Sequence, residues 1–347
     1  MFKYIKYLNP LILYALAIIS FTNTGLLCWL VLIYSWVFVP VLELFINPDT
    51  KNLTAAEEEL SKNDKLFDYM LYLIVFLQIP TLVFFFYSFT NNTLTTIDII
   101  GRITAMGMLC GTFGINVAHE LGHRKNKFEQ VLAKISLLSS LYMHFFIEHN
   151  KGHHKNVATP NDPSSARYNE WVYVFYFRTI IFSYLSAWHI ANDEMKKKNL
   201  SVLNLKNEML QVQIIQVAFV TAVYIFFGGW VTVYFLAAAL MGVLLLETVN
   251  YIEHYGLQRK QTTENKFERT MPEHSWNSNH LIGRLLLFEL SRHSDHHYLA
   301  SRKYQILKHH DNAPQLPTGY PGSMLLALVP PLWCSIMNKK IGAITTN

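Results

Sequence analysis

The sequence predicts an all-α integral membrane protein, a bundle of six transmembrane helices. Its 347 residues are 51% hydrophobic and only 15% charged, whereas soluble domains usually carry about 25% charged residues. This deficit of charge is uneven, because long apolar stretches alternate with charged ones. Six of the stretches approach the roughly 20 residues that a helix needs to cross a bilayer.

The six predicted spans are, in order, residues 8–25, 27–46, 67–89, 97–118, 211–228 and 230–251. A tight hairpin at Asn23-Thr24-Gly25 joins the first two, and a turn at Gly228-Gly229 joins the last two. Two further apolar stretches, 132–147 and 171–190, are interrupted by Lys134, His144 and Arg178. We expect these two to be half-buried or interfacial helices.

The positions of Lys and Arg predict the orientation of the spans. With the N-terminus in the cytoplasm, the loops after spans two, four and six are also cytoplasmic, and every Lys and Arg except Arg102 lies inside. The opposite orientation would place nearly all of them outside, against the excess of basic residues that cytoplasmic loops carry. We therefore expect both termini in the cytoplasm.

Charge and cysteine content narrow the possible functions. The net charge of +5 is modest, and we expect no nucleic-acid partner. Cys28, Cys110 and Cys334 are far apart and show no paired spacing. They indicate neither disulfides nor a thiolate metal site, and we expect them to be buried and inert.

Nine of the fifteen histidines fall into four tight groups. The groups are His119 and His123; His149, His153 and His154; His254; and His293, His296 and His297. All four lie on the cytoplasmic side of the predicted topology, although that topology was derived without them. Ionisable clusters at a membrane edge are costly and usually functional, so we interpret these nine histidines as metal ligands.

Their spacing and number predict two metal ions. Residues i and i+4 of a helix stack on one face, with about 5–6 Å between their Cβ atoms, so His119 and His123 can bind one ion. In each three-histidine group, the two residues four apart share a face while the third points to the side, so the group can serve two ions. Nine ligands exceed one coordination sphere but suit two ions with four or five each. Imidazole binds iron, zinc, copper and nickel; an electron-accepting centre that uses oxygen favours iron.

An intramembrane zinc protease is the main alternative from another class. Residues 119–123 match the His-Glu-x-x-His pattern, in which the glutamate activates a water molecule. Such an enzyme needs one further ligand and leaves six of the nine histidines without a role, so the full set argues against it. The lone histidines are expected to be structural (His144, His189, His309 and His310) or to be structural or support the ligands (His274 and His280).

Acidic residues beside the histidines are expected to balance the charge of the metals. Two ferrous ions held by neutral imidazoles would leave four positive charges in a low-dielectric setting, which is costly without nearby anions. Ligating histidines also usually donate their second ring N–H to a carboxylate or carbonyl. Five acids are suitably placed: Glu120, Glu148, Asp162, Glu253 and Asp295. We expect at least three to reach a ligating histidine directly or through one water, and capping or pairing with arginine is the alternative.

The histidine groups resemble the three boxes of the membrane di-iron superfamily of fatty-acid desaturases and hydroxylases. Longer strings are similar to those of the AlkB-type alkane 1-monooxygenases: residues 119–125, 148–154 with 157–163, 250–257, 274–280, 292–297 and 317–322. The resemblance extends nearly over the whole chain, as far as Trp333. Ser291 stands where glutamine is expected, and Tyr298-Leu299-Ala300 replaces a more polar, proline-containing stretch. Neither departure removes a ligand.

This resemblance implies one membrane-embedded catalytic domain, residues 1–347, in the bacterial inner membrane, with cytoplasmic site segments 119–210 and 252–347. It implies two iron ions (Fe2+/Fe3+) and O2 as co-substrate, with one oxygen atom entering the terminal C–H bond of a medium-chain alkane to give a 1-alkanol. It also implies that rubredoxin and a rubredoxin reductase supply the electrons. A fatty-acid desaturase or hydroxylase of the same superfamily is the alternative, because the ligand pattern is shared.

The substrate and the electron carrier suggest two further sets of residues. An alkane partitions into the bilayer lipid and would enter between the helices, so Trp29, Tyr34 and Trp36 on the second span are candidates for the lining of a channel; packing is the alternative. Basic residues around Arg124-Lys125-Lys127 and at Lys196-Lys197-Lys198 are candidates for attracting an acidic carrier. They fit equally well with membrane orientation alone.

Overall fold

A computed structural model describes residues 2–90, 93–264 and 266–345. Residues 1 and 346–347 at the ends of the predicted domain, residue 265, and residues 91–92 after the third predicted span lie outside this description. The chain divides into two compact units. Unit 1 comprises Met1–Tyr34, Leu66–Lys151 and Tyr184–Leu246, and unit 2 comprises Ser35–Lys65, Gly152–Ser183 and Glu247–Asn347. The expectation of one catalytic domain stays a prediction.

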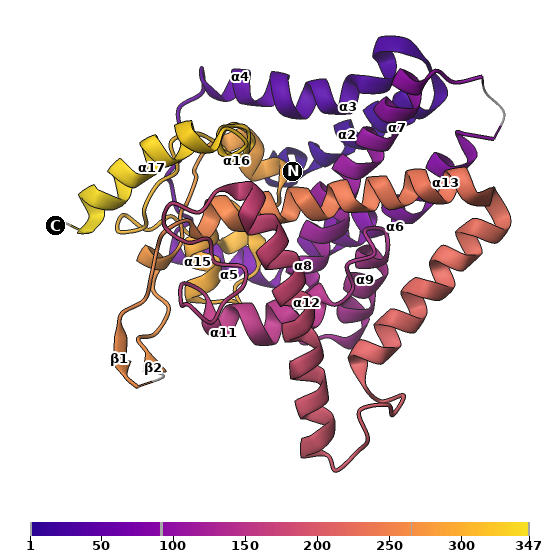
Figure 1. Cartoon of the computed structure of the whole chain (residues 1–347). Coiled ribbons are helices and arrows are strands. Elements are labelled where there is room, and N and C mark those ends of the chain that lie inside the picture. Colours follow the sequence, from indigo (N-terminus) through magenta and orange to yellow (C-terminus); the bar gives the residue numbers. More distant parts are fainter. Residues whose placement is uncertain (1, 91–92, 265, 346–347) are drawn as a thin grey trace. The chain divides into compact units, whose positions relative to one another are not determined.

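Both units are helical (Figure 1). Unit 1 contains α1 (Phe2–Ile5), α2 (Pro10–Thr22), α3 (Leu30–Ile33), α6 (Leu66–Tyr87), α7 (Thr96–Leu109), α8 (Asn116–Gly122), α9 (Lys127–Leu138) and α10 (Phe145–Glu148). Unit 2 contains α4 (Val39–Glu43), α5 (Ala55–Asn63), α11 (His154–Asn156), α14 (Leu281–Leu286), α15 (His293–Tyr298), α16 (Tyr320–Ala327), α17 (Pro330–Thr345) and the strands β1 (Gln261–Thr263) and β2 (Lys266–Phe267). Helices α12 (Val172–Lys197) and α13 (Glu208–His254) contribute to both units.

Short 3-10 and π-helical turns extend several of these helices. The 3-10 turns are Lys6–Leu8, Gly25–Trp29, Pro272–His274 and Tyr304–Ile306, and the π-helical turns are Tyr34–Phe38, Cys110–Ile115 and His149–His153. π-helical turns occur frequently at functional sites. One of them contains two of the grouped histidines, and another directly precedes α8, which carries His119.

Within the described residues, four helical segments are long and apolar enough to cross a membrane, or five if the bent pair α16–α17 forms one span. The four are Gly25–Glu43, Leu66–Tyr87, Thr96–Gly122 and Glu208–His254, and Lys6–Thr22 is a shorter apolar helix. The count of six spans and their orientation stay predictions. The fifth and sixth predicted spans fall on the two halves of α13, which breaks at Gly228, where φ is 83°. Glycine is favoured there because the left-handed region strains other residues.

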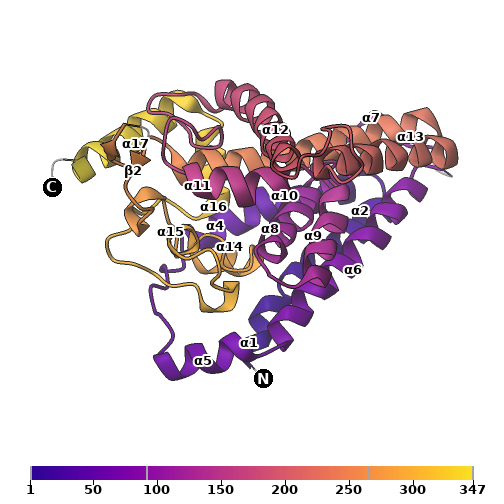
Figure 2. The ribbon, with the colours of Figure 1, turned by 90° about the horizontal axis from the view of Figure 1, so that it is seen from below.

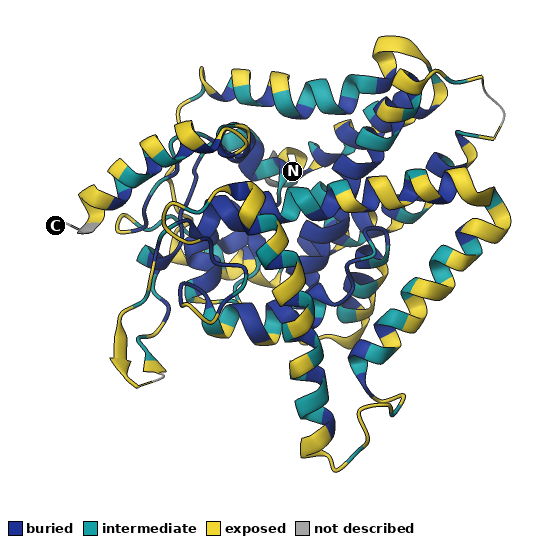
Figure 3. Ribbon diagram, viewed as in Figure 1, coloured by how far each residue is buried: buried dark blue, intermediate teal, exposed yellow. Residues whose placement is uncertain are grey.

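The apolar surface of these helices suits lipid. Exposed residues recur along both halves of α13 (Figure 3), and they include Phe226 and Trp230, with 79% and 75% of their surface exposed. Soluble monomers rarely expose large contiguous apolar patches. Such patches are the expected surface of a helix that faces hydrocarbon. The structure therefore supports the membrane class predicted from composition.

Small residues allow the helices of unit 1 to approach one another closely. A Cβ added to Gly107 would lie 2.7 Å from the sulfur of Met241, and one added to Gly242 would lie 2.7 Å from the Cβ of Cys110. Glycines at such contacts let two backbones pack directly, which is how membrane helices commonly associate. The three cysteines are free; Cys28 and Cys110 are buried as expected, whereas Cys334 is half-buried.

Charged side chains in unit 1 bind main-chain groups. Arg102, the predicted exception to the cytoplasmic placement of basic residues, is buried and donates to the carbonyl oxygens of Ser88 and Asn23. Asp98 accepts a 2.6 Å hydrogen bond from the N–H of Gly25. These contacts satisfy backbone groups where helices end, which are costly to leave unpaired away from water.

Unit 2 has short helices and many buried polar contacts. Helices α4, α14 and α16 pack against one another (Figure 2). At their contact, Glu43 accepts a 2.7 Å hydrogen bond from the N–H of Gly283, and its carboxylate lies against Gly319, where any Cβ would overlap it. Glu43 also borders a cavity of about 120 Å³ that His280 and Thr318 line. The glycine at position 319 is therefore required by close packing.

Candidate metal centre

Three grouped histidines lie together in unit 1. His119 is on α8 and His123 directly follows that helix, so the four-residue spacing stacks them, with ring centroids 5.0 Å apart. His149 begins the π-helical turn after α10, and its Nε2 lies 3.1 Å from the Nε2 of His123. The ring of His149 is 4.4 Å from that of His119. The three imidazole rings thus lie close enough together to bind one metal ion.

Four more histidines converge in unit 2, from three distant segments of the chain. They are His153 in the π-helical turn, His254 at the end of α13, and His293 and His297 on α15. One ring nitrogen from each lies within 4.8 Å of the others, and all four residues are buried. The Nε2 atoms of His153 and His297 are 3.2 Å apart, and so are those of His254 and His293. We call this set the four-histidine cluster.

The four-histidine cluster fits a metal ion. With a metal–nitrogen bond of about 2.0–2.1 Å, two neighbouring ligands are expected roughly 2.9–3.4 Å apart, and the two measured spacings of 3.2 Å fall in this range. One N–H···N hydrogen bond has a similar length, but it accounts for a pair and not for four converging nitrogens. Burial and the neighbouring histidines hold the pKa of His297 well below its ordinary value. Its imidazole is therefore neutral, the form that binds metal.

The last two grouped histidines form a pair in unit 2. The Nε2 of His154 lies 3.1 Å from the Nε2 of His296. Each stands beside a member of the four-histidine cluster in the sequence but is not part of that cluster. The predicted shared face holds for His293 and His297, which both belong to the cluster. It is wrong for His149 and His153, because these residues lie in a π-helical turn, whose wider winding does not stack residues four apart; His149 lies with His123 instead. Ligation by all nine histidines stays a prediction.

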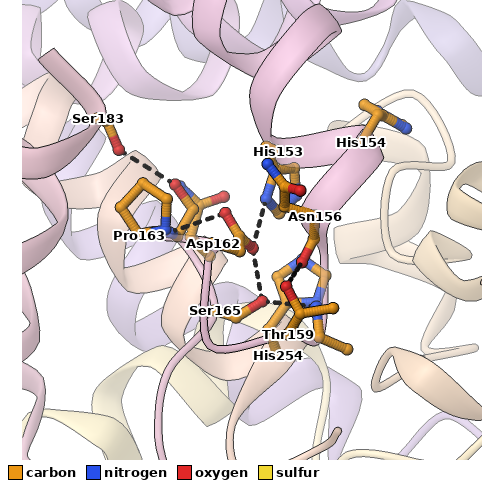
Figure 4. Close-up of polar contacts among 12 residues, drawn as sticks. His153, His154, Asn156, Thr159, Asp162, Pro163, Ser165, Ser183 and His254 are labelled. Atoms are coloured by element: carbon orange, nitrogen blue, oxygen red, sulfur yellow. Dashed lines mark hydrogen bonds and ion pairs between the residues drawn. The ribbon is translucent and has the colours of Figure 1, made fainter. Parts of the chain in front are cut away.

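Asp162 fixes the orientation of His153 (Figure 4). Its Oδ2 lies 2.9 Å from the Nδ1 of His153, and it also accepts hydrogen bonds from the Ser165 hydroxyl and the Ser164 N–H. Burial alone would raise the pKa of Asp162, but the attraction of His153 and these hydrogen bonds outweigh it, and the pKa lies below its ordinary value. A carboxylate at Nδ1 leaves Nε2 available for a metal.

Glu253 is the second predicted acid that contacts a grouped histidine directly. Its Oε2 lies 3.1 Å from the Nε2 of His293, and its Oε1 accepts a 2.7 Å hydrogen bond from the hydroxyl of Tyr320. Sequence reasoning did not select Tyr320. It belongs to residues 317–322, and the only signal for it in the sequence is the family resemblance of that string.

The defined contacts of the other three predicted acids involve other residues. Glu120 is 2.5 Å from Arg124 and Glu148 accepts from Ser186 at 3.3 Å. Asp295 binds Arg302, the Nε2 of His310 and the N–H of Lys308. Direct contacts with grouped histidines are defined for two of the five acids, Asp162 and Glu253. The expectation that at least three acids support ligating histidines stays a prediction.

The lone histidines have local partners. His144 is buried against Tyr142, and burial lowers its pKa to about 4. His274 accepts a hydrogen bond from the N–H of Met271, and His280 contacts Ser278. His189 pairs with Asp193 at 3.2 Å, and His309 lies 3.1 Å from the side-chain amide of Asn279. These contacts agree with structural roles.

The structure also places the basic residues proposed for docking and the aromatic residues proposed for a channel. Arg124, expected to be exposed for docking, is buried and paired with Glu120 and Asp68, so that part of the prediction is wrong; Lys125, Lys127 and Lys196–Lys198 are exposed. Tyr34 donates to Asn9 at 3.2 Å, which is a helix-packing contact, and Trp29 and Trp36 are half-buried. Their lining of a channel stays a prediction.

The fold and the histidines define a class, a helical membrane protein that gathers imidazoles for metal binding. The model of the family named "Fatty acid desaturase" matches residues 99–323, and the chain belongs to this family. An alkane 1-monooxygenase of Acinetobacter baylyi is 38% identical over 88% of this chain and 74% of its own length. Alkane 1-monooxygenase 2 of Pseudomonas aeruginosa is 38% identical over 91% of this chain and 84% of its own length.

A more distant relative acts on a different kind of substrate. The xylene/toluene monooxygenase hydroxylase component XylM of Pseudomonas putida is 26% identical over 70% of this chain and 64% of its own length. The family resemblance inferred from the histidine strings is thus confirmed.

Proposed function

We propose that this protein is an alkane hydroxylase that inserts one oxygen atom of O2 into the terminal C–H bond of a medium-chain alkane. The main support is the convergence of four histidine nitrogens in unit 2. In addition, the chain is similar over most of its length to alkane 1-monooxygenases. In the overall reaction, R–CH3, O2, two electrons and two protons give R–CH2OH and water. The apolar, exposed helices suit a substrate that dissolves in lipid.

The proposed cofactor is a pair of iron ions. The four-histidine cluster would hold one of them, and the remaining five grouped histidines stay predicted ligands. When bound, iron supplies the electron-transfer chemistry that activates O2. Imidazole donors also fit other metals, so the identity of the ion is part of the proposal.

The chain's own residues orient and neutralise this site. Asp162 holds the Nδ1 of His153, and Glu253 lies at the ring nitrogen of His293. Each supplies a negative charge beside an otherwise neutral set of donors, which offsets the cost of burying a cation. Burial of all four imidazoles excludes bulk water from their surroundings.

Electron supply and placement complete the proposal. We propose that rubredoxin, reduced by its reductase, delivers two electrons per turnover, and that the site and both termini lie on the cytoplasmic side of the bacterial inner membrane. The placement of basic residues supports this orientation. Exposed lysines at positions 125, 127 and 196–198 are available to an acidic carrier.

Product analysis with labelled oxygen tests the function. Purified protein in lipid, with rubredoxin and its reductase, is given octane, hexadecane or a fatty acyl substrate under 18O2. We expect labelled 1-octanol and two irons per chain by elemental analysis. Unlabelled alcohol, or one zinc and no iron, would refute the proposal.

The same assay separates the other candidates. A desaturase is favoured by the name of the matching family model, and it would yield an alkene in the acyl chain without incorporated label. The zinc-protease alternative is disfavoured by Glu120, which pairs with Arg124 at 2.5 Å and so is engaged elsewhere than in activating water.

A further inference from the structure

Tyr320 connects α16 to the metal site through a buried carboxylate. It is the first residue of α16, and only 1% of its surface is exposed. Its hydroxyl donates a 2.7 Å hydrogen bond to the Oε1 of Glu253. Glu253 is also 1% exposed and directly precedes His254 on α13. The hydroxyl thus reaches a carboxylate that adjoins a predicted ligand.

The other oxygen of this carboxylate faces the four-histidine cluster. The Oε2 of Glu253 lies 3.1 Å from the Nε2 of His293, which in turn lies 3.2 Å from the Nε2 of His254. Hydroxyl, carboxylate and imidazole therefore form one continuous buried chain that ends at the cluster. Every member belongs to unit 2.

When one oxygen of a carboxylate is held by a hydrogen bond, the position of its second oxygen is restricted as well. The terminal torsion of glutamate is broad and only weakly restricted by itself, so an unanchored Glu253 would sample several positions relative to His293. The Tyr320 hydrogen bond removes this freedom. The Oε2 of Glu253 faces the converging Nε2 of His293, so its charge lies beside the position that a metal would take. Loss of an acid that supports a metal site typically weakens metal binding roughly 10–100-fold.

The fold holds Tyr320 in place from its other side. Gly319, the residue before it, packs against the carboxylate of Glu43, and that carboxylate accepts a hydrogen bond from the N–H of Gly283. The start of α16 is thus held between the end of α4 and the end of α13. This explains why a glycine–tyrosine pair occupies these two positions.

We propose that Tyr320 is a positioning residue of the metal site, acting through Glu253. This rests on the proposed metal binding by the four-histidine cluster. Tyr320 contributes no metal donor in this role. It fixes the place of a negative charge beside the converging nitrogens of the four-histidine cluster.

The test is a double-mutant cycle on metal retention. Wild type, Tyr320→Phe, Glu253→Gln and the double variant are loaded with iron, and the half-time of metal release to an excess chelator is measured for each, with 57Fe Mössbauer spectra recorded before release. We expect Tyr320→Phe to speed release from one site about 10-fold and to alter the spectrum of one iron. In the Glu253→Gln background, the same change should add less than about 2-fold, because residues that act as a unit are not additive.

Tyr251→Phe is the matched control. Tyr251 is a fully buried tyrosine of the same unit, and its hydroxyl donates to the main-chain carbonyl of Glu170 at 2.6 Å. Its loss should lower thermal stability without changing metal release. Glu253→Gln changes the same contact from α13, so metal release still tests this contact if Tyr320→Phe does not fold.

The possible outcomes separate this inference from the function. A wild-type protein that binds no metal would refute both. A wild type that binds two irons, combined with unchanged release from Tyr320→Phe, would refute only the role of Tyr320. Equal acceleration by Tyr320→Phe in both backgrounds would show that it does not act through Glu253.

Discussion

Units 1 and 2 both gather predicted ligands, but they do so in different ways. In unit 1, the pair His119 and His123 comes from one helical turn, and local geometry alone stacks the two rings 5.0 Å apart. In unit 2, the four-histidine cluster draws on three segments that are up to 144 positions apart in the sequence, as His153 and His297 show. Helical periodicity alone brings His119 and His123 together, whereas the four-histidine cluster forms only through tertiary packing.

The two units also differ in how they tolerate buried polarity. In unit 1, Arg102 binds main-chain carbonyl oxygens, and glycines let the helices pack closely. Unit 2 buries acids beside histidines and holds them with further side chains, as Tyr320 holds Glu253. Changes to the glycines that pack unit 1 should therefore act mainly on stability, and changes to the acids beside the four-histidine cluster mainly on the metal.

Removing a ligand from the four-histidine cluster should have the largest effect. His254→Ala deletes a buried donor, and we expect loss of about one iron per chain and a fall in hydroxylation of at least roughly 100-fold, the upper range seen for perturbing a metal site. Elemental analysis and product formation measure it. His189→Ala, at an exposed histidine paired with Asp193, should leave both unchanged; equal losses in the two variants would break the comparison.

Asp162→Asn should have the next largest effect. It keeps the shape of the side chain but removes the charge at the Nδ1 of His153, so metal affinity should fall roughly 10–100-fold. Competition with a graded chelator measures this. Asp193→Asn, at a half-buried acid outside the cluster that pairs with His189, is the control. Unaltered affinity in Asp162→Asn would show that its contact with His153 serves folding alone.

Gly242→Ala tests unit 1. The added Cβ would lie 2.7 Å from the Cβ of Cys110, and overpacking of this kind typically costs about 1–3 kcal/mol. We expect a lower thermal midpoint with unchanged iron content. Gly342→Ala on α17, where a Cβ meets nothing within 4 Å, should instead be neutral or slightly stabilising, because alanine is the better helix former. Loss of iron in Gly242→Ala before unfolding would contradict the division of roles.

Salt should have the smallest effect. If an acidic carrier docks on the exposed lysines, its rate of electron delivery should fall several-fold as ionic strength rises from about 0.01 M to 0.15 M, because screening shortens the range of attraction. Neutralising Lys196, Lys197 and Lys198 to Gln should flatten this dependence, measured by stopped-flow reduction. A salt-independent rate would remove electrostatic steering from the proposal.

The sequence by itself determined the membrane class, the helical architecture and the grouping of the histidines. Long apolar stretches have few alternatives to helices in lipid, because every backbone group must be paired within the segment. The spacing of His119 and His123 determined their shared face for the same local reason. The break in α13 was also readable, since Gly228-Gly229 marks a position that favours positive φ.

Only the tertiary structure decided which acids reach which histidines. Glu253 and Asp295 each stand next to a predicted ligand in the sequence, yet one contacts His293 and the other binds Arg302 and His310. Arg124 appeared suited to docking until packing buried it against Glu120 and Asp68. Tyr320 is 67 positions from Glu253, and no local period links them. Such contacts depend on how short irregular segments pack against one another. Helix periodicity and sequence spacing do not determine this packing.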